Sequence, residues 1–465
     1  MIGSTVRIEN LTIKEYKNVK NGAIQFNNKR KNYRASVLGM YGQNGSGKTA
    51  LIDALELLKI VLCGMPLPEK FVDCINVDAE VARFEYQFNI CREDCRYEVW
   101  YEFGIRAVAD QDVLNMQDES GAVRMRPIIV DEVLSYAIKN GERKVRKSQL
   151  IDTRTTSPFV PRSKYMELVG QTDVTEVLVA KRYTQSTSRC FIFSREMTTI
   201  FHNNCKNVDY NTILEGLVRY GNRELFVINT ENTGLISLDA LPIAFKYKSN
   251  NRETIGNIMI PLNGSSTIPE ETFGVAKMVI DNMNIVLPQI VPDLTLELKD
   301  LGTMIFQNGK PGKNIQLMSL KNGKAIPFQY ESEGIKKIAS ILQLLIVAYN
   351  NESMTVAIDE LDAGIFEYLL GEILNIISER GKGQLIFTSH NLRPLETIDK
   401  GFIAFTTTNP ENRYIRMTNV KGNNNLRDFY YRDIVLGEQS EQLYAPTNNF
   451  EIALAFREAG VEYGA

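Results

Sequence analysis

Histidine, tryptophan and cysteine are scarce in this sequence. Its 465 residues include two histidines, one tryptophan and six cysteines. So few cysteines in a long chain argue against a disulfide framework and favour a reducing compartment. Cys91 and Cys95 are spaced like half of a metal site, but the sequence offers no second Cys/His pair to complete four ligands. Two half-buried strand cysteines are therefore the better interpretation.

Long hydrophobic runs are also missing. The longest mostly apolar stretch, Ile338 to Tyr349, is shorter than the ~20 residues that a membrane-spanning helix requires. Residues 1–20 contain no apolar core of a signal peptide. We therefore expect a cytoplasmic protein with no membrane partner.

The charge is nearly balanced, so the sequence has no overall attraction for nucleic acid or membranes. The net charge is −3, and 44% hydrophobic and 23% charged residues are ordinary for a globular protein. Two local basic clusters are candidates for nucleic-acid contact: Lys29, Arg30, Lys31 and Arg34, and Arg143, Lys144, Arg146 and Lys147. Both adjoin turn residues, and Tyr33 is the one aromatic residue among them, so solvated turns are the favoured interpretation.

A phosphate-binding loop is the strongest positive signal. The segment from Gly42 to Thr49 matches G-x-x-x-x-G-K-[ST] at each fixed position. A buried-strand pattern over 35–41 precedes it and a helical apolar period over 49–62 follows it, which is the context that the motif requires. The predicted nucleotide-binding residues are Gly42, Asn44, Gly45, Ser46, Gly47, Lys48 and Thr49. No N-K-x-D tetrapeptide for guanine recognition occurs, so ATP is preferred over GTP.

Two carboxylates and a histidine follow predicted strands about three hundred residues later. The apolar run 356–358 ends in Asp359 and Glu360, and His390 lies just after the predicted strand 384–388. A carboxylate at the end of such a strand can ligate Mg²⁺, and we assign this to Asp359 together with the Thr49 hydroxyl. Glu360 is the candidate general base or water-positioning group, and His390 is a second catalytic candidate.

Ser332-Glu333-Gly334 opens a predicted helix over 334–350. A serine and a glycine at a helix N-terminus can bind an anion through backbone N–H groups, the hydroxyl and the helix dipole. Serine there is equally a good N-cap. Its position shortly before the Asp359-Glu360 strand favours the anion site.

The chain divides into three predicted parts. Residues 1–130 form an ATPase lobe with the P-loop and an antiparallel layer, in which alternating runs over 84–90 and 97–103 are joined near 92–94. Residues 131–265 form an insertion of mixed or helical structure without a sustained heptad, and residues 266–465 form a second lobe of alternating strands and helices. The predicted fold class is α/β, a mixed sheet with helices plus an antiparallel β layer, split by a central insertion.

These motifs resemble those of the ABC ATPase superfamily and, within it, the SMC-related AAA15/OLD-like group. In that family an E-S-x-G segment, here Glu331 to Gly334, stands where transporters carry L-S-G-G-Q. The resemblance implies an ABC-type head in which Ser332 and Gly334 contact the γ-phosphate of an ATP bound by a second protomer. Two ATPs would then be sandwiched in a head-to-tail dimer, and Asp362 occupies the place of the D-loop across that interface.

The stretch from Asp359 to Tyr368 is similar to the ATPase subunits of bacterial anti-phage operons, in particular to that of the PARIS defence system. The resemblance implies a homo-oligomer that uses ATP and Mg²⁺ to control a separate TOPRIM-type nuclease in response to a phage-encoded trigger. Two features depart from the pattern: Gln87 falls inside a strand rather than in a glutamine loop, and Lys17 stands where SMC-like repair ATPases often have arginine. The alternative function is an SMC-like DNA repair or DNA-end-processing ATPase, in which nucleic acid would be a direct partner.

Overall fold

The computed structural model describes residues 4–28, 33–110, 124–140, 143–229, 240–249, 252–262, 264–306, 309–417, 425–437 and 439–461. Lys29, Arg30 and Lys31 of the first basic cluster lie outside the described residues, as does the side chain of Arg143.

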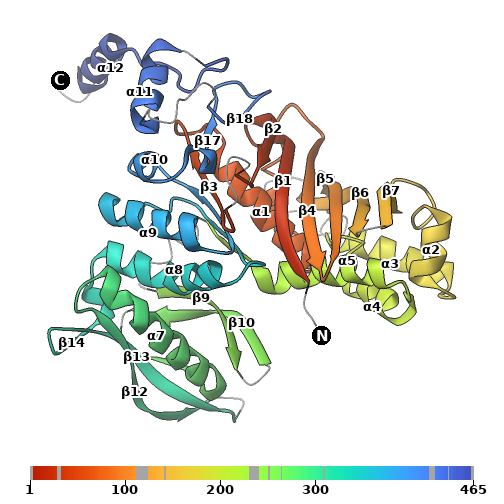
Figure 1. Cartoon of the computed structure of the whole chain (residues 1–465), viewed down its shortest axis with the longest axis horizontal. Helices are drawn as coiled ribbons and strands as arrows, with labels where there is room; N and C mark the ends of the chain where they lie inside the picture. The colour runs from red at the N-terminus through yellow and green to blue at the C-terminus, as the bar shows by residue number, and fades with distance from the viewer. Residues whose placement is uncertain are drawn as a thin grey trace.

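The nucleotide motifs lie on a six-stranded sheet at the centre of the molecule (Figure 1). Its strands, in spatial order, are β18 (Tyr414–Ile415), β17 (Ile403–Thr406), β3 (Ser36–Tyr41), β16 (Gln384–Thr388), β15 (Thr355–Ile358) and β8 (Leu225–Ile228). All neighbouring pairs from β17 to β8 are parallel, and β18 is antiparallel to β17. The sequence-predicted strands over 355–358 and 384–388 are confirmed. The strand expected from residue 401 begins only at Ile403, because a 3₁₀ turn occupies Lys400–Phe402.

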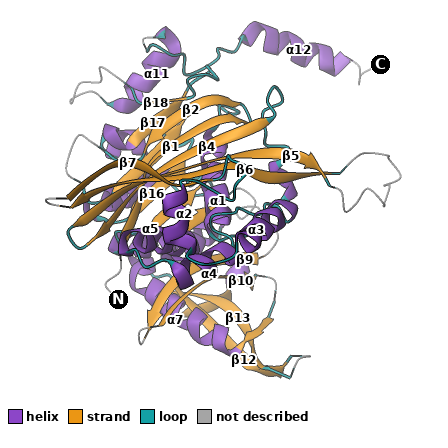
Figure 2. Ribbon diagram, turned by 90° about the vertical axis from the view of Figure 1, so that its right-hand side faces the viewer, coloured by secondary structure: helices purple, strands orange, loops and turns teal. Residues whose placement is uncertain are grey.

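A second six-stranded sheet is fully antiparallel and covers one side of the first (Figure 2). In spatial order it contains β2 (Val19–Gln25), β1 (Thr5–Tyr16), β4 (Val81–Arg92), β5 (Cys95–Ala109), β6 (Met125–Asn140) and β7 (Arg143–Asp152). The hairpin predicted near 92–94 is the β4–β5 connection. The domain boundary expected at residue 130 falls inside β6, which spans Met125–Asn140.

The helix α1 (Lys48–Leu62), which follows the P-loop, packs in the core shared by the two sheets. One face of the parallel sheet, with Leu38 and Ile386, joins α1 and the inner face of the antiparallel sheet in one apolar cluster. The opposite face, with Val37 and Phe387, joins a second cluster with the C-terminal helices. Successive strand residues point to opposite faces, so each of these buried strands serves two cores.

The remaining helices and strands complete the chain. The helices are α2 (Arg162–Val169), α3 (Val174–Ser186), α4 (Arg195–Asn204), α5 (Val208–Arg219), α7 (Glu270–Ile290), α8 (Glu333–Asn350), α9 (Glu367–Arg380), α10 (Pro394–Thr397), α11 (Leu426–Leu436) and α12 (Asn449–Val461). A further sheet contains β11 (Ser266–Pro269), β13 (Pro311–Lys321), β12 (Thr295–Ile305) and β14 (Lys324–Pro327), and β9 (Ala240–Ser249) pairs with β10 (Arg252–Pro261). In Figure 1 the β12–β13 sheet and α12 lie at opposite ends of the molecule. The predicted helix over 270–290 is confirmed as α7.

The middle of the chain contributes strands to both large sheets. β6 and β7 extend the antiparallel sheet, and β8 pairs with β15 at the edge of the parallel sheet, with Leu225 opposite Thr355. The backbone N–H of Asp359 also donates to the carbonyl of Ile228, at 2.8 Å. Helices α2 to α5 lie between β7 and β8 in the chain.

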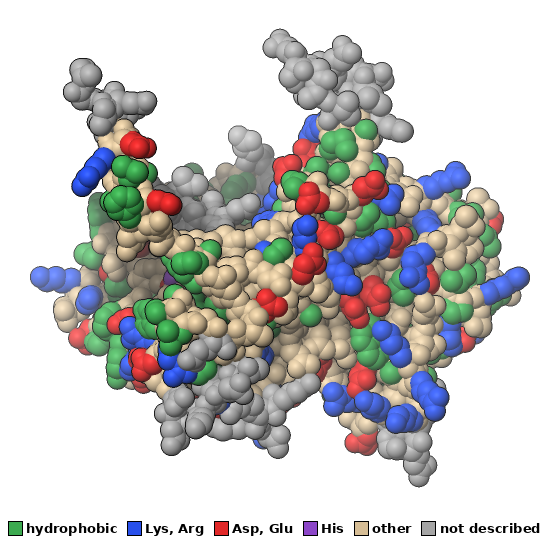
Figure 3. Space-filling model, turned by 90° about the horizontal axis from the view of Figure 1, so that it is seen from above, with side chains coloured by type: hydrophobic (Ala, Val, Ile, Leu, Met, Phe, Trp, Pro, Cys, Tyr) green, Lys and Arg blue, Asp and Glu red, His purple; other side chains and the backbone are tan. Residues whose placement is uncertain are grey.

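The surface carries both signs of charge. On the face shown in Figure 3, lysine and arginine side chains are interspersed with aspartate and glutamate. The second basic cluster lies on the edge strand β7 and not in a turn, which corrects the interpretation from sequence. There Lys147 lies 4.5 Å from the ring centroid of Trp100 and 3.9 Å from the Glu102 carboxylate. Charged side chains on an edge strand discourage pairing with another sheet.

No helix among the described residues combines the length and the apolar character needed to cross a bilayer.

Candidate functional site

Three adjacent parallel strands bring the distant motifs to one edge of the sheet. β3 leads into the P-loop, β16 leads into Ser389 and His390, and β15 leads into Asp359 and Glu360. Their spatial order is β3-β16-β15, and parallel strands end at the same edge. Ligands of open α/β sheets bind beyond the carboxyl ends of the strands, so this edge is where a nucleotide is expected.

A cavity of about 520 Å³ lies at this edge. This volume is within the range of small-molecule sites. It is lined by Lys17, Asn18, Asn44, Gly45, Gly47, Lys48, Thr49, Ala50, Asp359, Glu360, Thr388 and His390. Eight of the residues selected from sequence thus share one cavity. Its lining, within the described part of the chain, does not include the other five: Gly42, Ser46, Ser332, Gly334 and Asp362.

The P-loop has the backbone form that its glycines allow. Gly45 and Gly47 have φ angles of 73° and 95°, in the left-handed region that favours glycine. A Cβ on Gly45 would meet no atom within 4 Å, so this part of the loop faces open space. The Lys48 ammonium donates to the carbonyls of Gly42 and Gln43, at 2.8 and 3.0 Å, which holds it folded over the loop.

Lys48 is buried beside the acids. Burial lowers the pKa of its ammonium, while Asp359, Glu360 and Asp362 act in the opposite direction by stabilising the charge. These carboxylates come from a segment more than three hundred residues away in the sequence. The P-loop and the Asp-Glu pair therefore interact electrostatically in one protomer.

Thr388, at the end of β16, fixes the two acids relative to one another. Its hydroxyl donates to Asp359 Oδ1 at 2.5 Å and accepts from the backbone N–H of Glu360 at 2.8 Å. Glu360 has a φ of 48°, an uncommon value for a residue other than glycine. Such strained conformations persist where the surroundings determine them, and they concentrate at functional sites.

Asp362 connects the acidic segment to the histidine. One carboxylate oxygen accepts from the backbone N–H groups of His390 and Asn391, at 3.1 and 2.9 Å. The His390 side chain is exposed and lines the cavity. Asp362 thus orients the loop that carries His390, a role that the sequence did not suggest.

The residues present fit a magnesium-bound triphosphate. Asp359 is 1% exposed, yet its Oδ2 has no hydrogen-bond partner among the described residues. An unpartnered buried carboxylate oxygen is costly unless a cation or a water completes it. No group of three or more His, Cys, Asp or Glu side chains in the described part of the chain could hold a metal. Proteins usually bind Mg²⁺ through one or two carboxylates together with phosphates and waters.

Ser332 and Gly334 lie at the N-terminus of α8. Ser332 is the N-cap of this helix, and its hydroxyl accepts from the N–H of Ile335 at 3.4 Å. A Cβ on Gly334 would lie 2.2 Å from the carbonyl oxygen of Gly364. Gly334 is therefore needed for the close approach of α8 to the loop that follows the two acids.

We expect Gly334→Ala to destabilise the protein by about 1–3 kcal/mol, because the clash is with rigid backbone. A matched control is Gly274→Ala in α7, where the added Cβ would meet no atom within 4 Å and the helix gains about 0.5–1 kcal/mol. Thermal unfolding of both variants checks this, with a lower midpoint for the first and a higher one for the second. Equal midpoints would contradict the described packing of α8 on Gly364.

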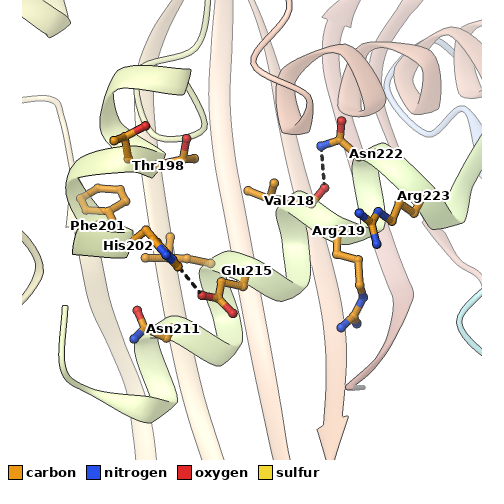
Figure 4. Close-up of a pocket in the computed structure, with 11 residues that line it drawn as sticks. Thr198, Phe201, His202, Asn211, Glu215, Val218, Arg219, Asn222 and Arg223 are labelled. Atoms are coloured by element: carbon orange, nitrogen blue, oxygen red, sulfur yellow. Dashed lines mark hydrogen bonds and ion pairs between the residues drawn. The ribbon is translucent and has the colours of Figure 1, made fainter. Parts of the chain in front are cut away.

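A larger cavity, of about 800 Å³, lies between α4 and α5 (Figure 4). Its charged side chains already interact with one another or with neighbours: His202 lies 3.6 Å from Glu215, and Arg219 pairs with Glu224 at 3.0 Å. It has no glycine-rich loop and none of the motif residues. Size alone therefore does not identify the functional site.

Sequence reasoning missed Thr388 and Asn18. Thr388 was noted only as the last residue of a strand, although a hydroxyl at that position is suited to contact the neighbouring strand end. Asn18 donates to the carbonyl of Gly45. Lys17 lines the cavity and pairs with Asp53 of α1.

No protein-family model matches the chain, and no curated protein is significantly similar to it in sequence. Among solved structures, an SMC head bound to the C-terminal winged-helix domain of ScpA has a TM-score of 0.39 and 13% identity, covering 89% of this chain and 98% of the other. A second SMC head, bound to the C-terminal domain of ScpA and derived from Pyrococcus furiosus, has a TM-score of 0.36 and 12% identity over 89% and 96% of the two chains. The SMC head from Thermotoga maritima has the same TM-score and identity over 89% and 99%.

TM-scores this low do not by themselves establish a relationship, so the class of the protein depends on its own geometry. The parallel sheet, the glycine loop between β3 and α1, and the antiparallel layer define an α/β P-loop fold. The predicted fold class is confirmed to this extent.

Proposed function

We propose that the protein is an ABC-type ATPase that binds and hydrolyses Mg²⁺–ATP between two protomers. One observation carries the proposal. The P-loop and the Asp359-Glu360 pair line one cavity, whereas Ser332 and Gly334 lie outside it. The cavity thus contains the phosphate loop and the two acids but lacks Ser332 and Gly334. In the head-to-tail dimer that the resemblance implies, Ser332 and Gly334 of a second copy of the chain complete the site.

In this proposal each site residue has a role in ATP binding or hydrolysis. The loop Gly42–Thr49 and Lys48 bind the phosphates, and Thr49 and Asp359 hold Mg²⁺, which neutralises charge on the phosphates. Glu360 orients and polarises the attacking water, and His390 lies at the same cavity, where it can contact the γ-phosphate side. Ser332 and Gly334 of one protomer contact the γ-phosphate of the other, and Asp362 supports the interface.

We further propose that ATP turnover controls a separate TOPRIM-type nuclease in anti-phage defence, in response to a phage-encoded trigger. The similarity of the segment 359–368 to such ATPase subunits supports this role. The rival function is a DNA repair or DNA-end-processing ATPase. The near-neutral charge and the mixed face in Figure 3 favour a protein partner over nucleic acid.

Steady-state ATPase assays with and without duplex DNA distinguish the two functions. We expect the ATPase rate with DNA to stay within about twofold of the rate without it. We also expect a nuclease subunit to co-purify when it is expressed from the neighbouring gene. A severalfold stimulation by DNA that declines steeply with salt would support the repair function instead. A protein that neither binds nor hydrolyses ATP would overturn both.

A further inference from the structure

We propose that Tyr414 is a positioning residue for phosphate binding, which holds the P-loop from the side of the core so that a backbone N–H group faces the cavity. Thr406 supports the same loop. The inference deepens the proposed function and rests on it. It gives a role in the ATPase site to β17 and β18, the two strands that lie beyond β3 in the central sheet (Figure 1).

Hydroxyl groups from β17 and β18 form hydrogen bonds with the P-loop. The Tyr414 hydroxyl donates to the carbonyl of Gly47 at 2.9 Å. The Thr406 hydroxyl forms a hydrogen bond with the hydroxyl of Ser46. The partners in each pair are at least 360 positions apart in the sequence, so local sequence patterns do not reveal these contacts.

Close packing keeps both hydroxyls in place. The Tyr414 ring lies against β2, where a Cβ on Gly22 would be 2.6 Å from the ring carbon Cδ2. A Cβ on Gly42 would be 1.8 Å from Thr406 Oγ1, so this hydroxyl lies directly against the first glycine of the P-loop. Tyr414 is 4% exposed and Thr406 is fully buried. The two side chains therefore have little freedom to move away from the loop.

The side from which Tyr414 reaches the loop determines where the next N–H group points. Tyr414 belongs to the apolar cluster around α1 and is not among the described residues that line the cavity, whereas Gly47 and Lys48 are. In a trans peptide the C=O and N–H bonds point in opposite directions. A Gly47 carbonyl that is held toward the core therefore directs the N–H of Lys48 toward the cavity.

This orientation favours phosphate binding because an anion needs N–H groups, and not carbonyl oxygens, around it. The first N–H groups of a helix have no partner inside the helix, and successive N–H groups form a concavity that binds anions. Gly47, with a φ of 95°, has no side chain to restrict its backbone. A hydrogen bond that fixes its carbonyl beforehand reduces the ordering that ATP binding has to impose. Tyr414 thus raises ATP affinity without touching ATP.

The test compares Tyr414→Phe with Tyr86→Phe as a matched control. Both changes keep a buried ring and remove a hydroxyl that donates to a backbone carbonyl, since Tyr86 donates to Ala54 of α1 at 2.7 Å. For Tyr414→Phe we expect the KM for ATP to rise about tenfold, the size of effect that one hydrogen bond produces. The Kd for Mg²⁺ with a non-hydrolysable ATP analogue, measured by calorimetry, should rise equally. We expect kcat to stay within about twofold, because the lost interaction affects substrate and transition state alike.

Tyr86→Phe should lower the midpoint of thermal unfolding as much as Tyr414→Phe does, and it should leave KM and kcat unchanged. The comparison thus separates positioning of the P-loop from a general loss of stability, which the two variants share. Equal ATP affinity in the two variants, or a fall in kcat without a rise in KM, would overturn the inference.

A second variant keeps the inference testable if Tyr414→Phe does not fold. Thr406→Val, which keeps the branched shape and removes the hydroxyl, is then measured with the same expected rise in KM, and an unchanged KM would overturn the inference. The wild type is titrated with the ATP analogue first, and a wild type that binds none would overturn the proposed function. If the wild type binds the analogue and Tyr414→Phe binds it equally well, this inference alone fails.

Discussion

Lys48→Ala is expected to weaken ATP binding by about 100-fold or more and to abolish turnover. The ammonium is held over the P-loop by the Gly42 and Gln43 carbonyls, where it can exchange these contacts for the β- and γ-phosphates. Each charge-assisted hydrogen bond contributes about 1.5–3 kcal/mol, and two of them account for a loss of this size. Calorimetric titration with ATP and a steady-state ATPase assay measure the two effects.

Lys59→Ala, on the same helix, is the control for this change. Its ammonium lies 4.9 Å from the centroid of the Phe226 ring, and the residue does not line the nucleotide cavity. We expect its ATP affinity to stay within about twofold of the wild type, as for substitutions remote from a site. Wild-type ATP affinity in Lys48→Ala would show that the P-loop is not the phosphate site.

Glu360→Gln is expected to reduce turnover by about 100-fold or more while ATP still binds. An amide keeps the shape of the side chain but cannot take a proton, and positioned bases contribute about 10²- to 10⁴-fold to a rate. Because ATP persists in this variant, the protein should accumulate as a closed dimer. Mass photometry with and without Mg²⁺–ATP, together with single-turnover hydrolysis, tests both consequences.

Glu367→Gln serves as the matched control for the charge change. Glu367 is exposed in the first turn of α9, seven residues beyond Glu360, and lies outside the cavity lining. The Glu367→Gln variant should hydrolyse ATP at the wild-type rate and show no additional dimer. Normal turnover in Glu360→Gln would mean that another group positions the water, and His390 would be the next candidate.

Local patterns predicted the elements on which the site is built. The glycine loop needs only a preceding strand and a following helix, and both occur as β3 and α1. The strand over 355–358 and the helix over 270–290 were likewise evident from short apolar runs and from the 3.6-residue period. These features depend on neighbours in the sequence, which is why one sequence sufficed to find them.

The pairing of strands that are far apart in the sequence could not be predicted from such local patterns. Nothing in the composition of residues 225–228 showed that they would pair with β15, because a short apolar run does not specify its partner. The hydrogen bonds of Thr388 to Asp359 and Glu360 depend on which strands become adjacent. The assignments of Ser332, Gly334 and Asp362 stay predictions, since a second copy of the chain has to complete the site.

Through the edge strand β8, the central segment of the chain is part of the parallel sheet that carries the candidate nucleotide site. The backbone N–H of Asp359, the magnesium candidate, donates to the carbonyl of Ile228. A polypeptide that lacked the central segment would therefore leave one edge of β15 without a paired strand. Any chimera that exchanges the middle of this protein for that of another must retain 225–228 in register with 355–358.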